Sequence, residues 1–197
     1  MTKEGGRRGS RGRPRSETTG PAILRAAREL VGEHGYDAVT TRMIADRARA
    51  GKEAIYRRWS GKAELVLDAF RSHAEDEIDE ADYRGPLSVD IADFLNRMFD
   101  ALRETGPAVR VLMAYAQHDP EFRALMRQRF IRPRREAFRR LLQAGRDRGE
   151  IPKASDLDVV VTTLYGAMWY RLLMDEPLDQ AFSASLAKFA IAGLGGC

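Results

Sequence analysis

The sequence predicts an all-α protein, with a small helix-turn-helix domain followed by a larger helical domain. Three observations support this fold class. Apolar residues recur at helical spacing in nearly every segment after residue 20. No segment has the alternating β-branched residues typical of a strand. Two short helical patterns are joined by a tight turn near residue 50. We therefore expect about nine helices.

The domain boundaries follow from composition. Residues 1–20 are rich in Gly, Arg and Ser and nearly devoid of apolar residues, so we expect a disordered basic arm. Residues 21–66 are expected to form the helix-turn-helix domain, whose first helix opens at Pro21, a residue suited to a first helical position. Residues 67–197 form the larger domain.

Three short patterns make up the helix-turn-helix domain after the first helix. The stretch "TTRMIADRA" predicts a helix capped by Thr40, "KEAIYRRW" predicts the next, and a fourth begins near Lys62. An inward-facing apolar set fits the packing of the middle pair: Ile44, Ala45, Ala48 and Ile55. The opposite face of residues 51–58 is then left to solvent.

Residues 88–105, 107–117, 121–147, 156–174 and 178–194 carry the helical patterns of the larger domain. Pro133 lies in the middle of the third of these. A proline there removes a backbone hydrogen bond and clashes with the preceding turn, so we expect a kink or a break.

Charge is distributed unevenly along the chain. Residues 1–62 hold 15 Lys and Arg against 7 Asp and Glu, whereas the remaining 135 residues hold 18 against 22. A basic amino-terminal part indicates a polyanionic partner, although a solubilising tail explains residues 1–20 equally well. Cys197 is the only cysteine, and no apolar run approaches the ~20 residues that span a bilayer. We expect a soluble cytoplasmic protein.

The stretch "TTRMIADRARAGKEAIYRRWSGKAELVLDAF" resembles the amino-terminal DNA-binding domain of TetR-type (tetracycline-repressor-like) transcriptional regulators. The likeness covers residues 21 to about 70. It includes the Thr-Thr-Arg opening, the tyrosine near the end of the recognition helix, an aromatic residue three positions on, and a lysine three further. The helical remainder resembles, more weakly, the ligand-binding and dimerisation domains of that family.

The residues that match the family's DNA surface, together with the solvent-facing Arg57, are Thr41, Arg42, Lys52, Glu53, Ala54, Tyr56, Arg57, Arg58 and Lys62. The resemblance implies that Tyr56, Arg58 and Lys62 contact mainly phosphates and that Trp59 packs between the third and fourth helices. Arg49 departs from the family, because it occupies a turn position usually given to glycine. The alternative for "EAIYRRW" is an ordinary amphipathic helix with a solvated basic face.

The arm contains "RGRPR", residues 11–15, which resembles the core of an AT-hook. In that element Arg11 and Arg13 would lie in the narrow minor groove of A·T-rich DNA. General attraction to phosphates is the alternative that we favour.

Methionine and aromatic residues lie on several helices of the larger domain, and such side chains suit a cavity for apolar ligands. It is the family resemblance that implies a ligand pocket here. The candidates are Phe94, Met98, Met113, Gln117, Met126, Phe130, Tyr165, Met168 and Trp169. An ordinary core is the alternative for each of them. A two-fold dimer seam is predicted at Leu164, Ala167, Leu186 and Phe189, with burial inside the monomer as the alternative.

These patterns, taken with the family resemblance, favour a homodimeric repressor that a small-molecule effector releases from a palindromic operator in double-stranded DNA. We expect no cofactor, no metal and no enzymatic activity. His34, His73 and His118 are far apart in sequence, and no phosphate-binding loop or nucleophile motif is present. A sequence-indifferent nucleic-acid binder is one alternative, and a helical enzyme is the other.

Overall fold

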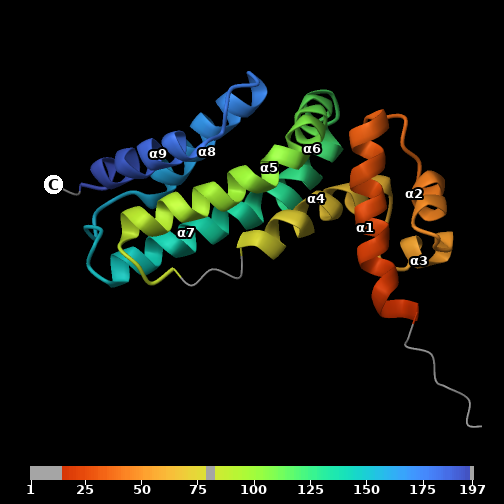
Figure 1. Ribbon diagram of the computed structural model, residues 1–197, viewed down its shortest axis with the longest axis horizontal. Helices are drawn as coiled ribbons and strands as arrows, with labels where there is room; N and C mark the ends of the chain where they lie inside the picture. The colour runs from red at the N-terminus through yellow and green to blue at the C-terminus, as the bar shows by residue number, and fades with distance from the viewer. Residues whose placement is uncertain (1–14, 79–82, 196–197) are drawn as a thin grey trace, which may run out of the picture.

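The computed structural model describes residues 15–78 and 83–195, and this part of the chain contains helices and loops but no strand (Figure 1). The elements are α1 (Arg15–His34), α2 (Thr41–Arg47), α3 (Lys52–Tyr56), α4 (Lys62–Ile78), α5 (Leu87–His118), α6 (Pro120–Met126), the π-helical turn η1 (Arg127–Ile131), α7 (Arg132–Asp147), α8 (Leu157–Leu173) and α9 (Gln180–Gly193). The all-α prediction is confirmed. None of these helices is both long and apolar enough to cross a membrane.

Helix α1 begins before the position predicted from the sequence. It starts at Arg15 and runs through Pro21. The prediction of a helix that opens at Pro21 is therefore wrong, and so is the prediction of an unstructured segment over residues 15–20. The proline removes one backbone hydrogen bond but leaves the neighbouring turns intact. Residues 1–14, including Arg11 and Arg13, lie outside the described residues, so the predictions for the arm are not addressed.

A compact core holds α1 to α4 together. Ile23, Ile44, Ile55 and Leu65 come from the four helices in turn, and each is fully buried. Burying a side chain of this size stabilises a fold by roughly 1.5–3 kcal/mol. Helix α4 packs on both α1 and α5, and the expected domain boundary between residues 66 and 67 falls within it. One continuous helix therefore joins the small domain to the larger one.

Helix α5 is a single helix of 32 residues, whereas the sequence predicted two. Pro107 lies inside it, but the residues that follow, Ala108, Val109 and Leu112, continue the buried face. Packing on both sides of the proline outweighs the loss of one backbone hydrogen bond. The prediction of a break at residue 106 is wrong for this reason.

The irregularity predicted at Pro133 is confirmed, and it takes the form of a wide turn. Helices α6 and α7 are joined by η1, which ends two residues before the proline. Pro133 has no N–H to donate to the carbonyl of Arg129, four residues earlier. A π-helical turn absorbs such a missing bond without ending the helix.

The first turn of α5 is capped from a distant part of the chain. Pro86 occupies the cap position and makes no side-chain cap bond. The Glu150 carboxylate instead accepts a 2.7 Å bond from the backbone N–H of Leu87 and a 2.6 Å bond from Nε of Arg148. The Leu87 N–H, followed by Arg148, lowers the pKa of Glu150 below its ordinary value.

This cap should make stability sensitive to acid. Because the pKa of Glu150 is lower in the folded state, its contribution is complete above the ordinary value of 4.5 and is lost as the pH falls through the folded-state pKa. Glu150→Gln should cost about 1 kcal/mol at pH 7. It should also flatten the decline in unfolding free energy at acid pH. Urea unfolding from pH 3 to 7 measures both effects, with exposed Glu121→Gln as the control; an equally steep acid decline in Glu150→Gln would contradict the cap.

Candidate nucleic-acid interface and effector cavity

The turn between α2 and α3 has a well-defined hydrogen-bond pattern. The backbone N–H of Ala50 donates to the carbonyl of Ala45 at 2.9 Å, and that of Arg49 donates to Asp46 at 3.2 Å. These two bonds form the helix-ending motif in which one residue adopts the left-handed conformation. Arg49 adopts it, with φ of 51°, at a cost of about 1 kcal/mol. The turn therefore keeps its geometry without the usual glycine.

The recognition helix α3 has one buried face and one exposed face, as predicted. Ile55 is fully buried against the core, whereas Tyr56 is 55% exposed. The Tyr56 hydroxyl lies 3.0 Å from Oγ1 of Thr41 at the start of α2. Lys52, Glu53 and Arg57 are also exposed, next to this pair. The helix thus presents a cationic surface with an oriented tyrosine.

The other predicted contact residues take different positions around this surface. Arg42 is exposed and lies 3.8 Å from Asp46 on its own helix. Arg58 is exposed, and its Nη1 donates to the carbonyl of Ala54, which is half-buried, at 3.2 Å. Lys62 is half-buried; its ammonium group donates to the carbonyl of Tyr36 at 3.0 Å and lies over that ring. Phosphate contact by Lys62 stays a prediction.

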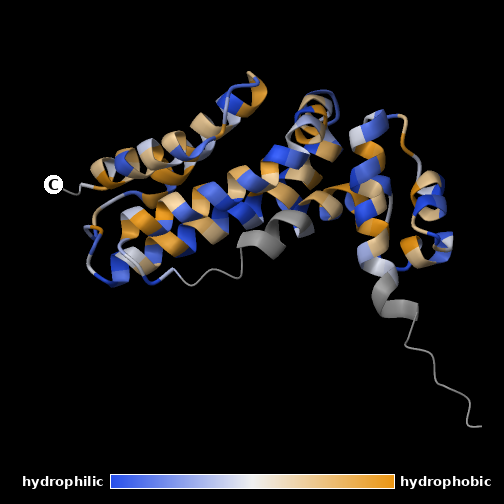
Figure 2. Cartoon of the chain, viewed as in Figure 1, coloured by the Kyte–Doolittle hydropathy of each residue, from blue (hydrophilic) through white to orange (hydrophobic). Residues whose placement is uncertain are grey.

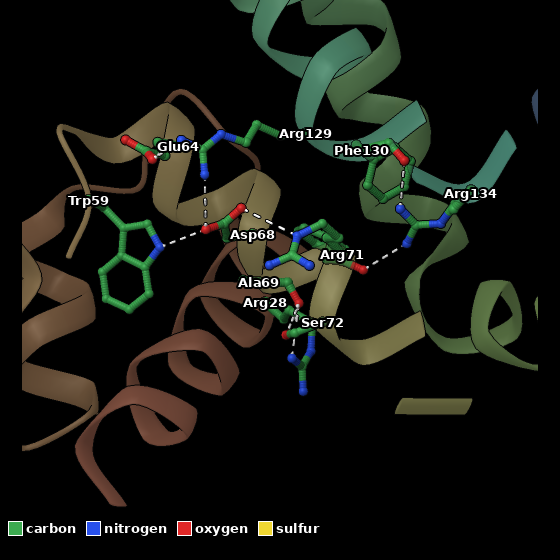
Figure 3. A network of polar contacts seen from close by, with 11 residues as sticks. Arg28, Trp59, Glu64, Asp68, Ala69, Arg71, Ser72, Arg129, Phe130 and Arg134 are labelled. Atoms are coloured by element: carbon green, nitrogen blue, oxygen red, sulfur yellow. Dashed lines mark hydrogen bonds and ion pairs between the residues drawn. The ribbon is translucent and has the colours of Figure 1, made fainter. Parts of the chain in front are cut away.

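Trp59 connects the recognition helix to a polar network (Figure 3). The indole is buried, as predicted, and its Nε1–H donates to Oδ2 of Asp68 on α4 at 3.0 Å. Arg129 from η1 lies 3.6 Å from the same oxygen and also bonds Glu64. The Glu64 carboxylate accepts bonds of 2.9 and 2.6 Å from the backbone N–H and hydroxyl of Ser60. One guanidinium group therefore holds two carboxylates that fix the end of the recognition helix.

A second arginine ties the same turn to α4 from the interior. Arg134 is buried, and its guanidinium donates to the carbonyl of Phe130 at 2.9 Å and to that of Phe70 at 3.0 Å. It also stacks on the Phe130 ring at 3.7 Å from the centroid. Figure 3 shows both arginines reaching α4 from the segment that carries η1 and the start of α7.

The network predicts energetic coupling between Trp59 and Arg129. Trp59→Phe removes the Nε1 donor and Arg129→Met removes the charge, and both act on Asp68. Combining them should give an interaction energy of about 0.5–1.5 kcal/mol in a double-mutant cycle. Denaturant unfolding of the four proteins measures it. Arg132→Met is the matched control, because Arg132 pairs with Glu136 on its own helix and should be additive with Trp59→Phe.

A small cavity, here called the inner chamber, lies between α5, the η1–α7 segment and α8. Its lining residues are Met98, Ala101, Leu102, Thr105, Phe130, Arg134, Met168 and Trp169. Its volume is about 10 Å³, which is room for roughly one water molecule. Leu102 separates it from a larger surface groove of about 410 Å³, here called the outer groove, which Phe99, Gly106, Arg110 and Asp175 also line.

Four of the predicted pocket residues line the inner chamber: Met98, Phe130, Met168 and Trp169. The others lie outside its lining. Phe94 packs on Phe138 with ring centroids 4.9 Å apart, and Met126 and Tyr165 are buried. Met113 is half-buried, and the exposed Gln117 bonds the carbonyl of Met113. Phe94 fills the core and Gln117 bonds its own helix, so neither of them lines the inner chamber.

Two of the predicted dimer-seam residues are buried within the chain. Leu164 is 1% exposed and Leu186 is 7% exposed, so their assignment to the seam is wrong. Ala167 is half-buried, whereas Phe189 on α9 is 56% exposed. Helix α8 adds exposed apolar side chains at Val159, Tyr170 and Leu173. Figure 2 shows that apolar residues colour much of both helices.

Sequence reasoning missed the residues that connect the two domains. Arg129 and Glu64 are 65 residues apart, and no local pattern links such a pair. The same separation hides the Arg110–Asp175 pair, which lies inside the larger domain at the outer groove. Arg47 was also missed; its guanidinium bonds Glu33 at 2.9 and 2.8 Å and fixes α2 to α1. From the sequence alone, an arginine at position 47 is equally well explained as a solvated surface charge.

Comparison with known proteins agrees with this geometry. Residues 23–69 match the family model "Bacterial regulatory proteins, tetR family", and residues 81–190 match "Tetracyclin repressor-like, C-terminal domain". The uncharacterised regulator YdeS of Bacillus subtilis is 34% identical over 185 residues, 93% of each chain. The repressor TetR of Mycobacteroides abscessus is 29% identical, covering 87% of this chain and 91% of that protein.

Among solved structures, the TetR-family regulator SCO0332 superposes with a TM-score of 0.74 at 29% identity, covering 90% of this chain and 98% of that one. Both the recognition helix and the helical body are thus shared with these regulators. The chain belongs to the tetR family of bacterial regulatory proteins and is a DNA-binding transcriptional regulator.

Proposed function

We propose that the protein is a repressor that binds a palindromic operator as a homodimer and leaves it when a small molecule occupies the larger domain. The observation that carries this proposal is that neighbouring residues of the η1–α7 segment contact both candidate sites. Phe130 and Arg134 line the inner chamber, and the adjacent Arg129 bonds the carboxylates that fix Trp59 and Ser60.

The candidate DNA surface consists of Thr41, Arg42 and the exposed face of α3, with Lys62 beside it. Tyr56, Arg57 and Arg58 are proposed to bind phosphates, whereas Lys52 and Glu53 face the base edges. The Thr41 contact keeps the Tyr56 ring extended from the surface. Two copies related by a two-fold axis would place their recognition helices one or more turns of DNA apart, about 34–36 Å per turn.

The exposed apolar residues of α8 and α9 are the proposed dimer surface: Val159, Tyr170, Leu173 and Phe189. Ala167 lies among them and is small enough for close helix approach. An isologous contact of this kind uses the same residues on both copies. Apolar exposure on two adjacent helices of one chain supports this assignment.

The effector acts through differential affinity for two arrangements of the dimer. Filling the inner chamber displaces Phe130 or Arg134, and η1 then pulls Arg129 and α4 with it. The recognition helices change their spacing as a result. No new contact with DNA is needed for release.

Footprinting on the DNA that flanks the protein's own gene tests this proposal. We expect a protected palindrome and, against a scrambled duplex of equal length, an affinity ratio of at least about 10³ at 150 mM salt. Equal affinity for both duplexes would favour the sequence-indifferent binder instead. Turnover of a substrate without DNA affinity would favour an enzyme.

A further inference from the structure

The buried hydroxyl of Tyr165 has no hydrogen-bond partner. The residue is 3% exposed, and its ring packs against Phe138 with centroids 6.3 Å apart. A buried hydroxyl without a partner is a site of lost stability, and native chains rarely retain one without a reason. An intended ligand is one such reason.

Tyr165 stands next to the inner chamber along α8. Met168 and Trp169, three and four positions later, line that chamber and therefore lie on the same side of the helix. Arg134, another lining residue, comes from α7, the helix whose Phe138 packs on the Tyr165 ring. Burial raises the pKa of Tyr165 despite the charges of Arg134 and Arg135, so at neutral pH the hydroxyl stays protonated and is a donor.

The remaining lining of the chamber is apolar apart from the indole N–H of Trp169 and the Thr105 hydroxyl, which donates to the carbonyl of Ala101 at 2.7 Å. Two methionines, Met98 and Met168, face the cavity, and methionine side chains rearrange readily around a ligand. The chamber is narrow because these side chains fill it, so a ligand enters by displacing them. Leu102 is the side chain that the chamber shares with the outer groove.

We infer that the inner chamber binds a small apolar monocarboxylic acid, whose carboxylate accepts hydrogen bonds from the Tyr165 hydroxyl and the Arg134 guanidinium. This inference rests on the proposed function, since it names the class of effector for the same cavity. Guanidinium groups bind carboxylates more strongly than they bind neutral carbonyls. The bound carboxylate replaces the carbonyl of Phe70, which Arg134 now holds at 3.0 Å, and so loosens α4.

The test uses the full-length protein with octanoate and trans-cinnamate as probes and their primary amides as neutral counterparts. Isothermal titration calorimetry measures binding. The wild-type protein should bind each acid at least about tenfold more tightly than its amide, since an ionised acceptor strengthens these hydrogen bonds. Equal binding of acid and amide, or binding of neither, would overturn the inference.

Tyr165→Phe separates a ligand role from a packing role. It should weaken acid binding about tenfold and leave the melting temperature unchanged or raised, because the lost hydroxyl has no partner in the free protein. Tyr115→Phe is the matched control: its hydroxyl donates to Asp119 at 3.3 Å, so its loss should lower the melting temperature and spare acid binding. Unchanged acid affinity in Tyr165→Phe would refute the assignment.

Operator binding, followed in the same samples, distinguishes the two proposals. If the protein binds its flanking DNA specifically but binds no acid, the proposed function stands and this inference fails. If the protein binds acids but shows no preference for that DNA, the proposed function fails instead. Release of the operator by the acids, but not by the amides, supports both.

Discussion

Replacing Trp59 with alanine should unfold much of the DNA-binding domain, whereas replacing Tyr56 with alanine should leave the fold intact. Trp59 is 6% exposed and its indole donates to Asp68. Truncating a buried tryptophan costs about 3–5 kcal/mol, and here it also leaves the Asp68 carboxylate without that donor. Urea unfolding followed by circular dichroism measures the loss.

Tyr56→Ala is the matched comparison, three residues away on the same short segment. Its ring is 55% exposed, so stability should change by no more than about 0.5 kcal/mol. Operator affinity should nevertheless fall about tenfold or more, because both half-sites lose a phosphate contact. Electrophoretic mobility shifts on operator and scrambled duplex should show the same proportional loss. A strong loss of stability in Tyr56→Ala, or none in Trp59→Ala, would contradict the assigned faces of α3.

Introducing a charge at the proposed dimer surface should have the second large effect. Phe189→Asp and Val159→Asp each put a carboxylate where an apolar side chain is now more than half exposed. Burying two such charges opposite each other across a two-fold axis is unfavourable, so the dimer should dissociate. Analytical ultracentrifugation should show the mass falling from about twice 22.2 kDa to one chain.

The loss of the dimer should also weaken operator binding by roughly 10²-fold or more, because the second half-site no longer binds as part of the same molecule. Val111→Asp is the control, since Val111 is 44% exposed on α5 and lies outside the proposed surface. Val111→Asp should remain dimeric and bind the operator with unchanged affinity. A dimer that survives both Phe189→Asp and Val159→Asp would place the seam elsewhere.

The sequence predicted those features that depend on neighbouring residues. Helical periodicity was sufficient for the all-α fold, and the spacing of Ile44, Ala45 and Ile55 identified the buried side of the helix-turn-helix. Tyr56 was predicted to be exposed, and it is. These predictions succeed because a short amphipathic helix has one apolar stripe, which fixes its orientation on the core. The inward packing of Trp59 was implied by the family resemblance, and it is confirmed.

Proline positions were harder to interpret, because the outcome depends on packing from elsewhere. Pro21 and Pro107 each lie inside a continuous helix, whereas the irregularity near Pro133 takes the form of η1. A local rule gives the cost of the missing hydrogen bond but not the tertiary contacts that offset it. The same limit applies to Leu164 and Leu186, whose apolar character fits a seam and a core equally well.

The sequence by itself determined that this chain carries a basic recognition helix ahead of a helical body. The helices follow from periodicity and charge along the chain, and the role of the recognition helix follows from the family resemblance of its motif. Only the tertiary structure showed that Arg129 and Arg134 connect the two parts, and that Tyr165 keeps an unpaired hydroxyl beside a narrow chamber. Contacts between residues some 65 positions apart depend on how the helices pack. No pattern in the local sequence encodes that packing.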